Sequence, residues 1–271
     1  MPSATPSLVD IGINLSNSSF AHDYAKVVDN GIAAGVEKML ITGTSLSESQ
    51  QTLALVQELS PERPNCLFTT AGVHPHDAKS WEPHHRKAFR ELLDQPEVIA
   101  VGECGLDFNR DFSPRPVQEQ VFAEHLSLAS ETKLPLFLHE RDAHERFIGI
   151  WREHRDTITA GGVVHCFTGS EAALRAYLDE GFYIGITGWV CDERRGEELQ
   201  RLVPMIPDDR LLIETDGPYL LPRDLKPKPK SRRNEPIYLP HIATTIARLR
   251  GQSPDAVATR TTANACQLFS M

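Results

Sequence analysis

The sequence predicts a (β/α)₈ barrel of the TIM type, folded as a single domain. Short apolar runs rich in β-branched residues alternate with longer amphipathic segments, and the connections between them are short. This alternation is typical of parallel strands joined by crossover helices. Eight such units fit within 271 residues, which is the usual size of a closed barrel. A doubly wound open sheet is the alternative, but no glycine-rich phosphate loop follows the first predicted strand.

The strands are expected where an apolar run is bounded by polar or turn-forming residues. In chain order they cover residues 8–14, 36–43, 66–74, 98–107, 134–139, 162–167, 182–190 and 210–216. No linker and no shift in composition divides the chain. We therefore expect a short N-terminal tail at residues 1–7 and one domain at residues 8–271.

The segments between the strands carry helix start and stop signals. Ser45 followed by Glu48 has the pattern of a capping box before an apolar stripe. Ser113 is a candidate N-cap, with Pro114 in the first turn. Further helices are expected in residues 141–154, 170–181 and 235–251, the last two ending at glycine.

Composition and charge exclude several classes of protein. No apolar run is long enough to cross a membrane, and the N-terminus lacks the basic and apolar parts of a signal peptide. The five cysteines have no zinc-type spacing, as expected for reduced thiols in the cytoplasm, and Cys104 and Cys166 are expected in the core. A net charge of −9 argues against nucleic-acid binding over the whole surface but permits a local basic patch.

Polar side chains recur at the carboxyl ends of the predicted strands, where barrel enzymes carry their chemistry. They are Asn14, His74, Glu103, His139, His165 and Asp216. One histidine at a strand end is usually structural, but three histidines and two carboxylates at five ends indicate a shared site. Converging carboxylates repel each other unless a cation compensates their charge. We therefore expect a divalent metal: Zn²⁺, Mn²⁺ or, with fewer nitrogen ligands, Mg²⁺.

The segment LLIETDGPYLLP places two carboxylates in an apolar stretch. In a strand, Glu214 and Asp216 share one face with Leu212. Buried carboxylates are costly unless they are paired or bind a metal. Asp216 is expected to bind the metal or to accept a proton from its water. Glu214, one layer deeper, is expected to hydrogen-bond a metal-binding histidine.

Several motifs together resemble the TatD-type deoxyribonucleases, a metal-dependent branch of the amidohydrolase-like barrels. They are TAGVHPHD, VGECGLDFNRDFS, LHERDAHERF, VVHCFTGS, YIGITGWVCDERRG, LLIETDGPYLLPRDL and SRRNEP, and the resemblance runs from about residue 9 to residue 269. It implies that Glu103, His139 and His165 bind the metal. It further implies that Asp216 is the catalytic acid or base, with metal binding as a second role, and that His74 lies near the scissile phosphate.

The activity implied by the resemblance is Mg²⁺-dependent removal of nucleotides from DNA ends, mainly as a 3′–5′ exonuclease on single strands. In some members RNA is also a substrate, and roles in DNA repair and in nuclear breakdown during cell death are attributed to the family. Arg141 and the RRNEP segment, with Arg232, Arg233 and Asn234, are expected near the substrate.

Cations and aromatic residues could extend such a site. The basic loop, residues 222–236, is either a phosphate-binding loop after the eighth strand or a solvated proline-rich loop. Trp189, Phe108 and Tyr219 are candidates for base stacking, with packing as the alternative. The remaining candidates are histidines expected at the surface or in hydrogen bonds: His76, His84, His85 and His144.

One departure from the family pattern lies at the end of the first strand. Many members carry an H-x-H pair there, whereas this chain has Gly12 and Asn14. A second metal position should then bind poorly or use oxygens from substrate and water, which makes Asn14 a candidate substrate-binding residue. The bacterial TatD subgroup tends to have this variant, and DIGINLSNSSF and GWVCDERRG favour that subgroup.

Two other functions remain open at this point. The first is a barrel metallohydrolase acting on a small-molecule ester, amide or phosphotriester, although such enzymes usually need H-x-H and a bridging group at the fourth strand, where Glu103 stands. The second is a non-catalytic barrel. We expect a monomer that binds single-stranded nucleic acid and needs neither a membrane nor a protein partner.

Overall fold

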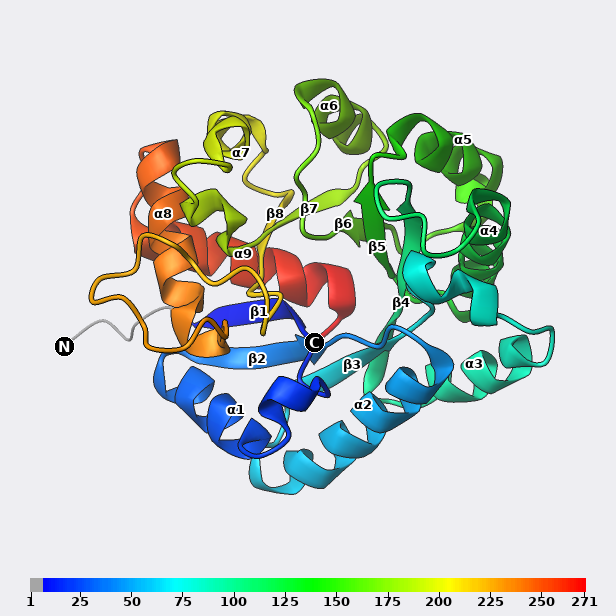
Figure 1. The fold of residues 1–271 in the computed structure, drawn as a ribbon, viewed down its shortest axis with the longest axis horizontal. Coiled ribbons are helices and arrows are strands. Elements are labelled where there is room, and N and C mark those ends of the chain that lie inside the picture. Colours follow the sequence, from blue (N-terminus) through cyan, green and yellow to red (C-terminus); the bar gives the residue numbers. More distant parts are fainter. Residues whose placement is uncertain (1–6) are drawn as a thin grey trace.

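The computed structural model describes residues 7–271, and its eight strands form one parallel sheet in the order of the chain (Figure 1). The strands are β1 Leu8–Ile13, β2 Val36–Ile41, β3 Leu67–Ala71, β4 Val98–Asp107, β5 Leu136–Arg141, β6 Gly162–Val164, β7 Tyr183–Ile186 and β8 Leu211–Ile213. Each overlaps its predicted range, so the predicted barrel is confirmed. The predicted tail, residues 1–7, lies outside the described residues except for Ser7.

Helices follow the strands and surround the sheet (Figure 1). They are α1 Tyr24–Ala33, α2 Leu46–Leu59, α3 His85–Leu93, α4 Arg115–Thr132, α5 His144–His154, α6 Glu171–Asp179, α7 Glu197–Leu202, α8 Leu239–Arg250 and α9 Pro254–Phe269. Ser45 caps α2 by accepting from the Glu48 amide, as predicted. The predicted cap at Ser113 is wrong: α4 has Pro114 at its N-cap, and the Ser113 hydroxyl instead donates to the His76 carbonyl.

The barrel is closed by contacts between the end of β1, with the residue after it, and the chain segment that follows β8. A single bridge pairs Ile13 with Gly217. The Asn14 amide donates to the Gly217 carbonyl at 2.7 Å, and the Asp216 amide donates to the Gly12 carbonyl at 2.8 Å. Residues expected in the site therefore also complete the barrel wall.

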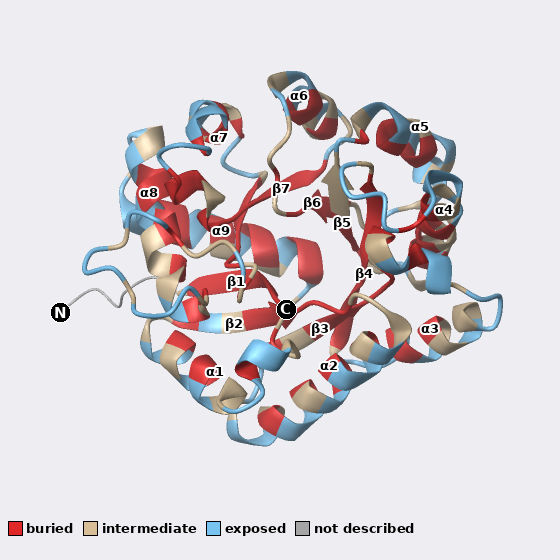
Figure 2. Ribbon diagram, in the orientation of Figure 1, coloured by how far each residue is buried: buried red, intermediate tan, exposed pale blue. Residues whose placement is uncertain are grey.

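Two apolar layers hold the fold together, one inside the barrel and one between strands and helices. Figure 2 shows the strands almost wholly buried and the helices buried on their inward faces. The inner layer includes Ile11, Phe137 and Leu212, and α9 adds Leu268 and Phe269 to it. Burial of this apolar surface drives folding and leaves the carboxyl ends of the strands free for polar groups. No helix within residues 7–271 is long and apolar enough to span a membrane.

Candidate active site

A cavity of about 410 Å³ opens at the carboxyl ends of the strands. It brings together all six polar residues predicted from the strand ends: Asn14, His74, Glu103, His139, His165 and Asp216. Not all of them end a strand, because β3 stops before His74 and β5 continues past His139 to Arg141. The extension of β5 follows from its long neighbour, since β4 pairs with β5 as far as Asp107 and Arg141.

Glu103 lies at the centre of this group. Its Oε1 atom is 2.8 Å from His165 Nε2, 3.0 Å from His139 Nδ1 and 3.3 Å from His74 Nε2. Burial by itself raises the pKa of Glu103, but the adjacent imidazoles hold that pKa well below its usual value. Donor atoms of His74, Glu103 and His139 lie within 4.8 Å of one another, close enough to share one metal ion. Three imidazoles therefore surround one ionised carboxylate oxygen.

The two ring nitrogens of His139 face different carboxylates, Nδ1 facing Glu103 and Nε2 facing Asp107. Its Nε2 atom lies 3.4 Å from Asp107 Oδ2 but makes no hydrogen bond within the described chain. Burial opposes protonation of His139, yet the carboxylates of Asp107 and Glu103 raise its pKa overall. A buried nitrogen without a hydrogen-bond partner is unusual. His139 Nδ1, 3.0 Å from Glu103 Oε1, is the nitrogen placed to share a cation with Glu103.

Asp107 was not among the site residues predicted from the sequence. Its Oδ2 atom is 2.7 Å from His76 Nε2, and its Oδ1 atom accepts from the Arg110 amide. The missed signal was the strand period, because Glu103, Gly105 and Asp107 alternate along one strand. His76, expected in a surface or hydrogen-bonding role, makes this contact and lines the central cavity.

Glu214 lies below the central group and is fully buried. Its Oε2 atom is 3.4 Å from His165 Nδ1, and its Oε1 atom accepts from the Cys166 amide at 2.6 Å. The glycines at positions 12 and 185 make room for it, because a Cβ there would lie 2.4 Å and 2.7 Å from its oxygens. This carboxylate sits where it can orient His165 with Nε2 towards Glu103.

Two cysteines were expected in the core, but the structure places only one of them there. Cys104 is fully buried among core residues. Cys166 instead lines the central cavity with a positive φ of 46°, so that expectation was wrong for Cys166. The reason is that β6 ends at Val164, and strand alternation no longer fixes the direction of the side chain at position 166.

Asp216 faces the cavity beside Asn14, whose Nδ2 atom donates to Asp216 Oδ1 at 3.0 Å. The pKa of Asp216 is raised to about 7, mainly by burial and in part by the charges of Glu214 and Glu103, while His165 and the hydrogen bond from Asn14 oppose the rise. A carboxylate with this pKa can accept and return a proton near neutral pH. Asn14 fixes one of its oxygens and leaves the other for a second contact.

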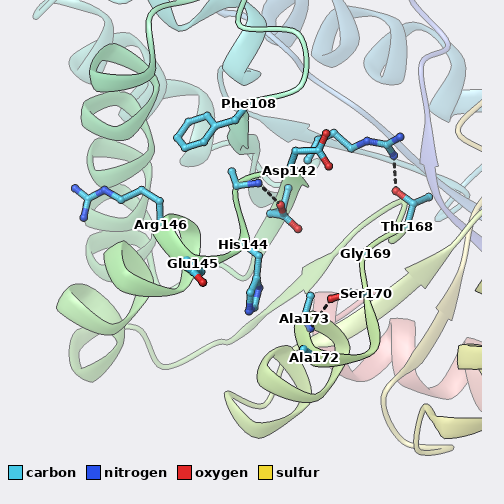
Figure 3. A pocket seen from close by; sticks show the side chains of 13 residues that line it. Phe108, Asp142, His144, Glu145, Arg146, Thr168, Gly169, Ser170, Ala172 and Ala173 are labelled. Atoms are coloured by element: carbon cyan, nitrogen blue, oxygen red, sulfur yellow. Dashed lines mark hydrogen bonds between the residues drawn. The ribbon is translucent and has the colours of Figure 1, made fainter.

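A larger cavity of about 660 Å³ lies beside the carboxyl end of β5. Figure 3 shows Phe108, His144 and Ser170 around it, and Arg141 hydrogen-bonds Thr168 at its rim. Arg141 therefore lies next to the central cavity rather than in its lining. His144, expected at the surface or in a hydrogen bond, is half-buried, and its Nδ1 atom has no hydrogen-bond partner in residues 7–271.

The RRNEP residues do not lie together in the central cavity. Arg232 lines a third cavity, of about 350 Å³, together with Trp189, Arg223 and Lys228. Arg233 is bound by Asp23 at 2.8 Å and by Glu235 at 2.8 Å.

The remaining residues of this region have mainly structural contacts. Asn234 is fully buried and donates to the Thr215 carbonyl at 2.8 Å. The contacts of Arg233 and Asn234 hold the basic loop in place. Tyr219 lines the central cavity and is 54% exposed, so its ring remains accessible.

An eight-stranded barrel with a histidine and carboxylate cluster at its carboxyl mouth defines the class of barrel hydrolases. The chain belongs to the TatD-related DNase family, whose family model matches residues 9–270. It is 54% identical to a 3′-5′ ssDNA/RNA exonuclease TatD of Salmonella typhimurium, over 97% of this chain and 99% of that protein.

Two further relatives agree with this assignment. The protein of the same name from Escherichia fergusonii is 53% identical over 97% of this chain and 99% of its own. A crystal structure of a hydrolase TatD family protein from Entamoeba histolytica superposes with a TM-score of 0.89. It is 26% identical and covers 98% of this chain and 99% of that one.

Proposed function

We propose that the protein is a divalent-metal-dependent nuclease that removes nucleotides from the 3′ ends of single-stranded DNA and of RNA. The observation that carries this proposal is the convergence of three imidazoles on one oxygen of Glu103, with Asp216 in the same cavity. The names of relatives at 50–54% identity support the substrate and the polarity. We further propose a monomeric single-domain enzyme that acts in the cytoplasm in DNA repair or degradation.

The donor set fits a divalent cation. Glu103, His139 and His165 supply one carboxylate and two imidazoles, and Asp216 supplies a further oxygen at the rim. His165 faces Glu214 through Nδ1, which directs Nε2 towards Glu103, so that both could bind one cation. A divalent cation held there would lower the pKa of a water molecule and neutralise charge on a phosphate oxygen. We propose Mg²⁺ in turnover, with Zn²⁺ and Mn²⁺ as other ions that this donor set accepts.

His74 is better suited to donate a hydrogen bond than to bind the metal. Its Nδ1 atom accepts from the His76 amide at 3.1 Å, so in the neutral ring the proton resides on Nε2. Burial lowers the pKa of His74, which favours this neutral form. An Nε2–H group in the cavity can donate to a phosphate oxygen while Glu103 and His139 bind the cation.

Asp216 is placed to act as the general base. The bond from Asn14 holds its side chain in the cavity, and its raised pKa lets it take a proton from water at neutral pH. The other oxygen of Asp216 can orient the attacking water. An in-line attack expels the leaving 3′ oxygen of the shortened strand on the opposite side of phosphorus, so its proton comes from solvent or from the Nε2–H group of His74.

The test is time-resolved cleavage of an end-labelled single-stranded oligonucleotide, with Mg²⁺ and with EDTA. We expect a ladder that shortens from the 3′ end only with Mg²⁺. Asp216→Asn should slow it by about 10²- to 10⁴-fold, the usual contribution of a general base, with an unchanged circular dichroism spectrum. Near-normal rates in Asp216→Asn would remove Asp216 as the base. Absence of cleavage by folded, metal-loaded protein would favour a small-molecule ester or phosphotriester as substrate.

A further inference from the structure

A second group of metal-binding side chains lies outside the central cavity. It consists of Cys191, Asp224 and His241, and one donor atom of each lies within 4.8 Å of those of the other two. They come from the short 3₁₀ helix Gly188–Cys191 after β7, from the loop after β8 and from α8. We propose that these side chains form a second metal site, for a cation of the zinc class, which fastens the loop after β8 to the barrel.

The distances are close to those that a tetrahedral site requires. With metal–ligand bonds of about 2.0 to 2.3 Å, neighbouring ligand atoms in such a site lie about 3.3 to 3.7 Å apart. Asp224 Oδ1 is now 2.7 Å from His241 Nε2, as in an ion pair. Asp224 is exposed and His241 is half-buried, so small rotations of these two side chains would make room for an ion between them.

The donor chemistry selects the ion. A thiolate, an imidazole and a carboxylate suit Zn²⁺ and related borderline-soft cations, whereas Mg²⁺ and Ca²⁺ prefer oxygen alone. The group around Glu103 that can share an ion has no sulfur donor. The two sites therefore differ in the metal that they prefer, and a water molecule would complete the second one.

The surroundings of Cys191 favour a metal-bound thiolate. Its Sγ atom donates to Thr245 Oγ1 at 3.4 Å. After loss of the thiol proton, rotation of the hydroxyl would let Thr245 donate to the thiolate sulfur instead. Binding would release the thiol proton to solvent, and the cation would compensate the buried negative charge.

A metal at this place would restrain the loop that carries the cationic residues. The chain between β8 and Pro236 contains no helix or strand, and side-chain contacts such as those of Arg233 and Asn234 help to hold it. Asp224 follows Arg223 in the chain. The Arg223 Nε atom lies 3.6 Å from Oδ2 of Asp192, the residue that follows Cys191. Arg223 also lines the basic cavity beside Trp189. Occupancy of the second site would thereby fix one wall of that cavity.

The test is a Co²⁺ titration of reduced, chelator-treated full-length protein. Co²⁺ replaces Zn²⁺ in such sites, and a sulfur ligand adds an intense thiolate-to-metal absorption band in the near ultraviolet. We expect this band in the wild type and its removal by added Zn²⁺. It should persist in the control Cys66→Ser, which replaces another buried thiol, and be absent in Cys191→Ser. Asp224→Asn and His241→Gln should each weaken Co²⁺ binding at least about 10-fold.

Several outcomes would overturn the second site. A wild type without the band would do so, as would a band that survives in Cys191→Ser and disappears in Cys166→Ser, which alters the thiol in the central cavity. If Cys191→Ser does not fold, the variants of Asp224 and His241 test the proposed site instead. Unchanged Co²⁺ affinity in both Asp224→Asn and His241→Gln rejects the site, and weakened affinity supports it. None of these readouts depends on nuclease activity.

Discussion

The carboxylate of Glu214 occupies the space into which a side chain at position 12 would project. A Cβ on Gly12 would lie 2.4 Å from Glu214 Oε2, well inside van der Waals contact. The same carboxylate accepts from the Cys166 amide and lies against His165. In this barrel a side chain at position 12 would therefore displace Glu214, whereas glycine leaves room for it.

We expect Gly12→Ala to lower the free energy of unfolding by about 1 to 3 kcal/mol, the usual cost of overpacking a buried site. The new methyl group would push Glu214 away from the Cys166 amide and leave buried polar groups unpaired. Urea denaturation followed by circular dichroism measures this change. Gly149→Ala in α5 is the control, because the nearest atom to its added Cβ would be 4.0 Å away. Equal losses in both variants would contradict the steric explanation.

We expect Glu103→Gln to weaken divalent-metal binding at the central site at least about 10-fold, because the change removes the one charge that three imidazoles share. Isothermal titration calorimetry with Mn²⁺ measures the affinity. Glu140→Gln is the matched control, since Glu140 follows His139 in β5 but contacts the Ala143 amide and the Tyr177 hydroxyl instead. Unaltered Mn²⁺ affinity in Glu103→Gln would place the ion elsewhere.

Nucleic-acid binding should depend on the cations that line the basic cavity. We expect the double variant Lys228→Gln/Arg232→Gln to reduce the slope of log affinity against log salt by about 1.4, for two lost phosphate contacts on a single strand. The control Lys226→Gln/Lys230→Gln removes the same charge from the same loop, at exposed positions outside that cavity. Fluorescence anisotropy with an Asp216→Asn background avoids cleavage. Equal slopes for both double variants would show that only the overall charge of the loop matters.

His125 should make the protein sensitive to acid. Burial, with a smaller contribution from the charge of Arg86, lowers its pKa from an ordinary value of 6.5 to about 4, although the hydrogen bond to the Val121 carbonyl opposes this shift. In the folded chain its Nε2 atom accepts from the Val73 amide, which requires the neutral ring. Between these pH values the unfolded chain takes up a proton that the folded chain excludes. The contribution of His125 to the free energy of unfolding is therefore fully present above pH 6.5. It falls by about 3 kcal/mol as the pH decreases towards 4.

The measurement is the free energy of unfolding at several pH values from 4 to 7, in the wild type and in His125→Gln. The variant should be less stable at pH 7 and should lose less stability on acidification than the wild type. Parallel pH profiles would show that other buried groups account for the acid sensitivity.

The barrel and the central group could be predicted because both follow from local periodicity. Apolar runs at regular intervals define the strands, and polar residues at their ends must meet at one mouth. Contacts between distant segments leave no such local pattern. Arg233 carries a charge typical of a phosphate-binding residue, but its partner Asp23 lies 210 positions away. Asn234 was expected near the substrate, yet it supports the backbone at Thr215.

The contacts that close the barrel, between the end of β1 and the segment after β8, also determine when the site can form during synthesis of the chain. The hydrogen bond between Asn14 and Asp216 spans 202 positions, and the Asn14 amide is held by the Gly217 carbonyl. A nascent chain on the ribosome lacks Asp216 and the closing strand until most of its length has emerged. It can then carry His74, Glu103 and His139 without the residue proposed to accept the proton. Incomplete translation products are therefore expected to be inert towards the nucleic acids that surround them.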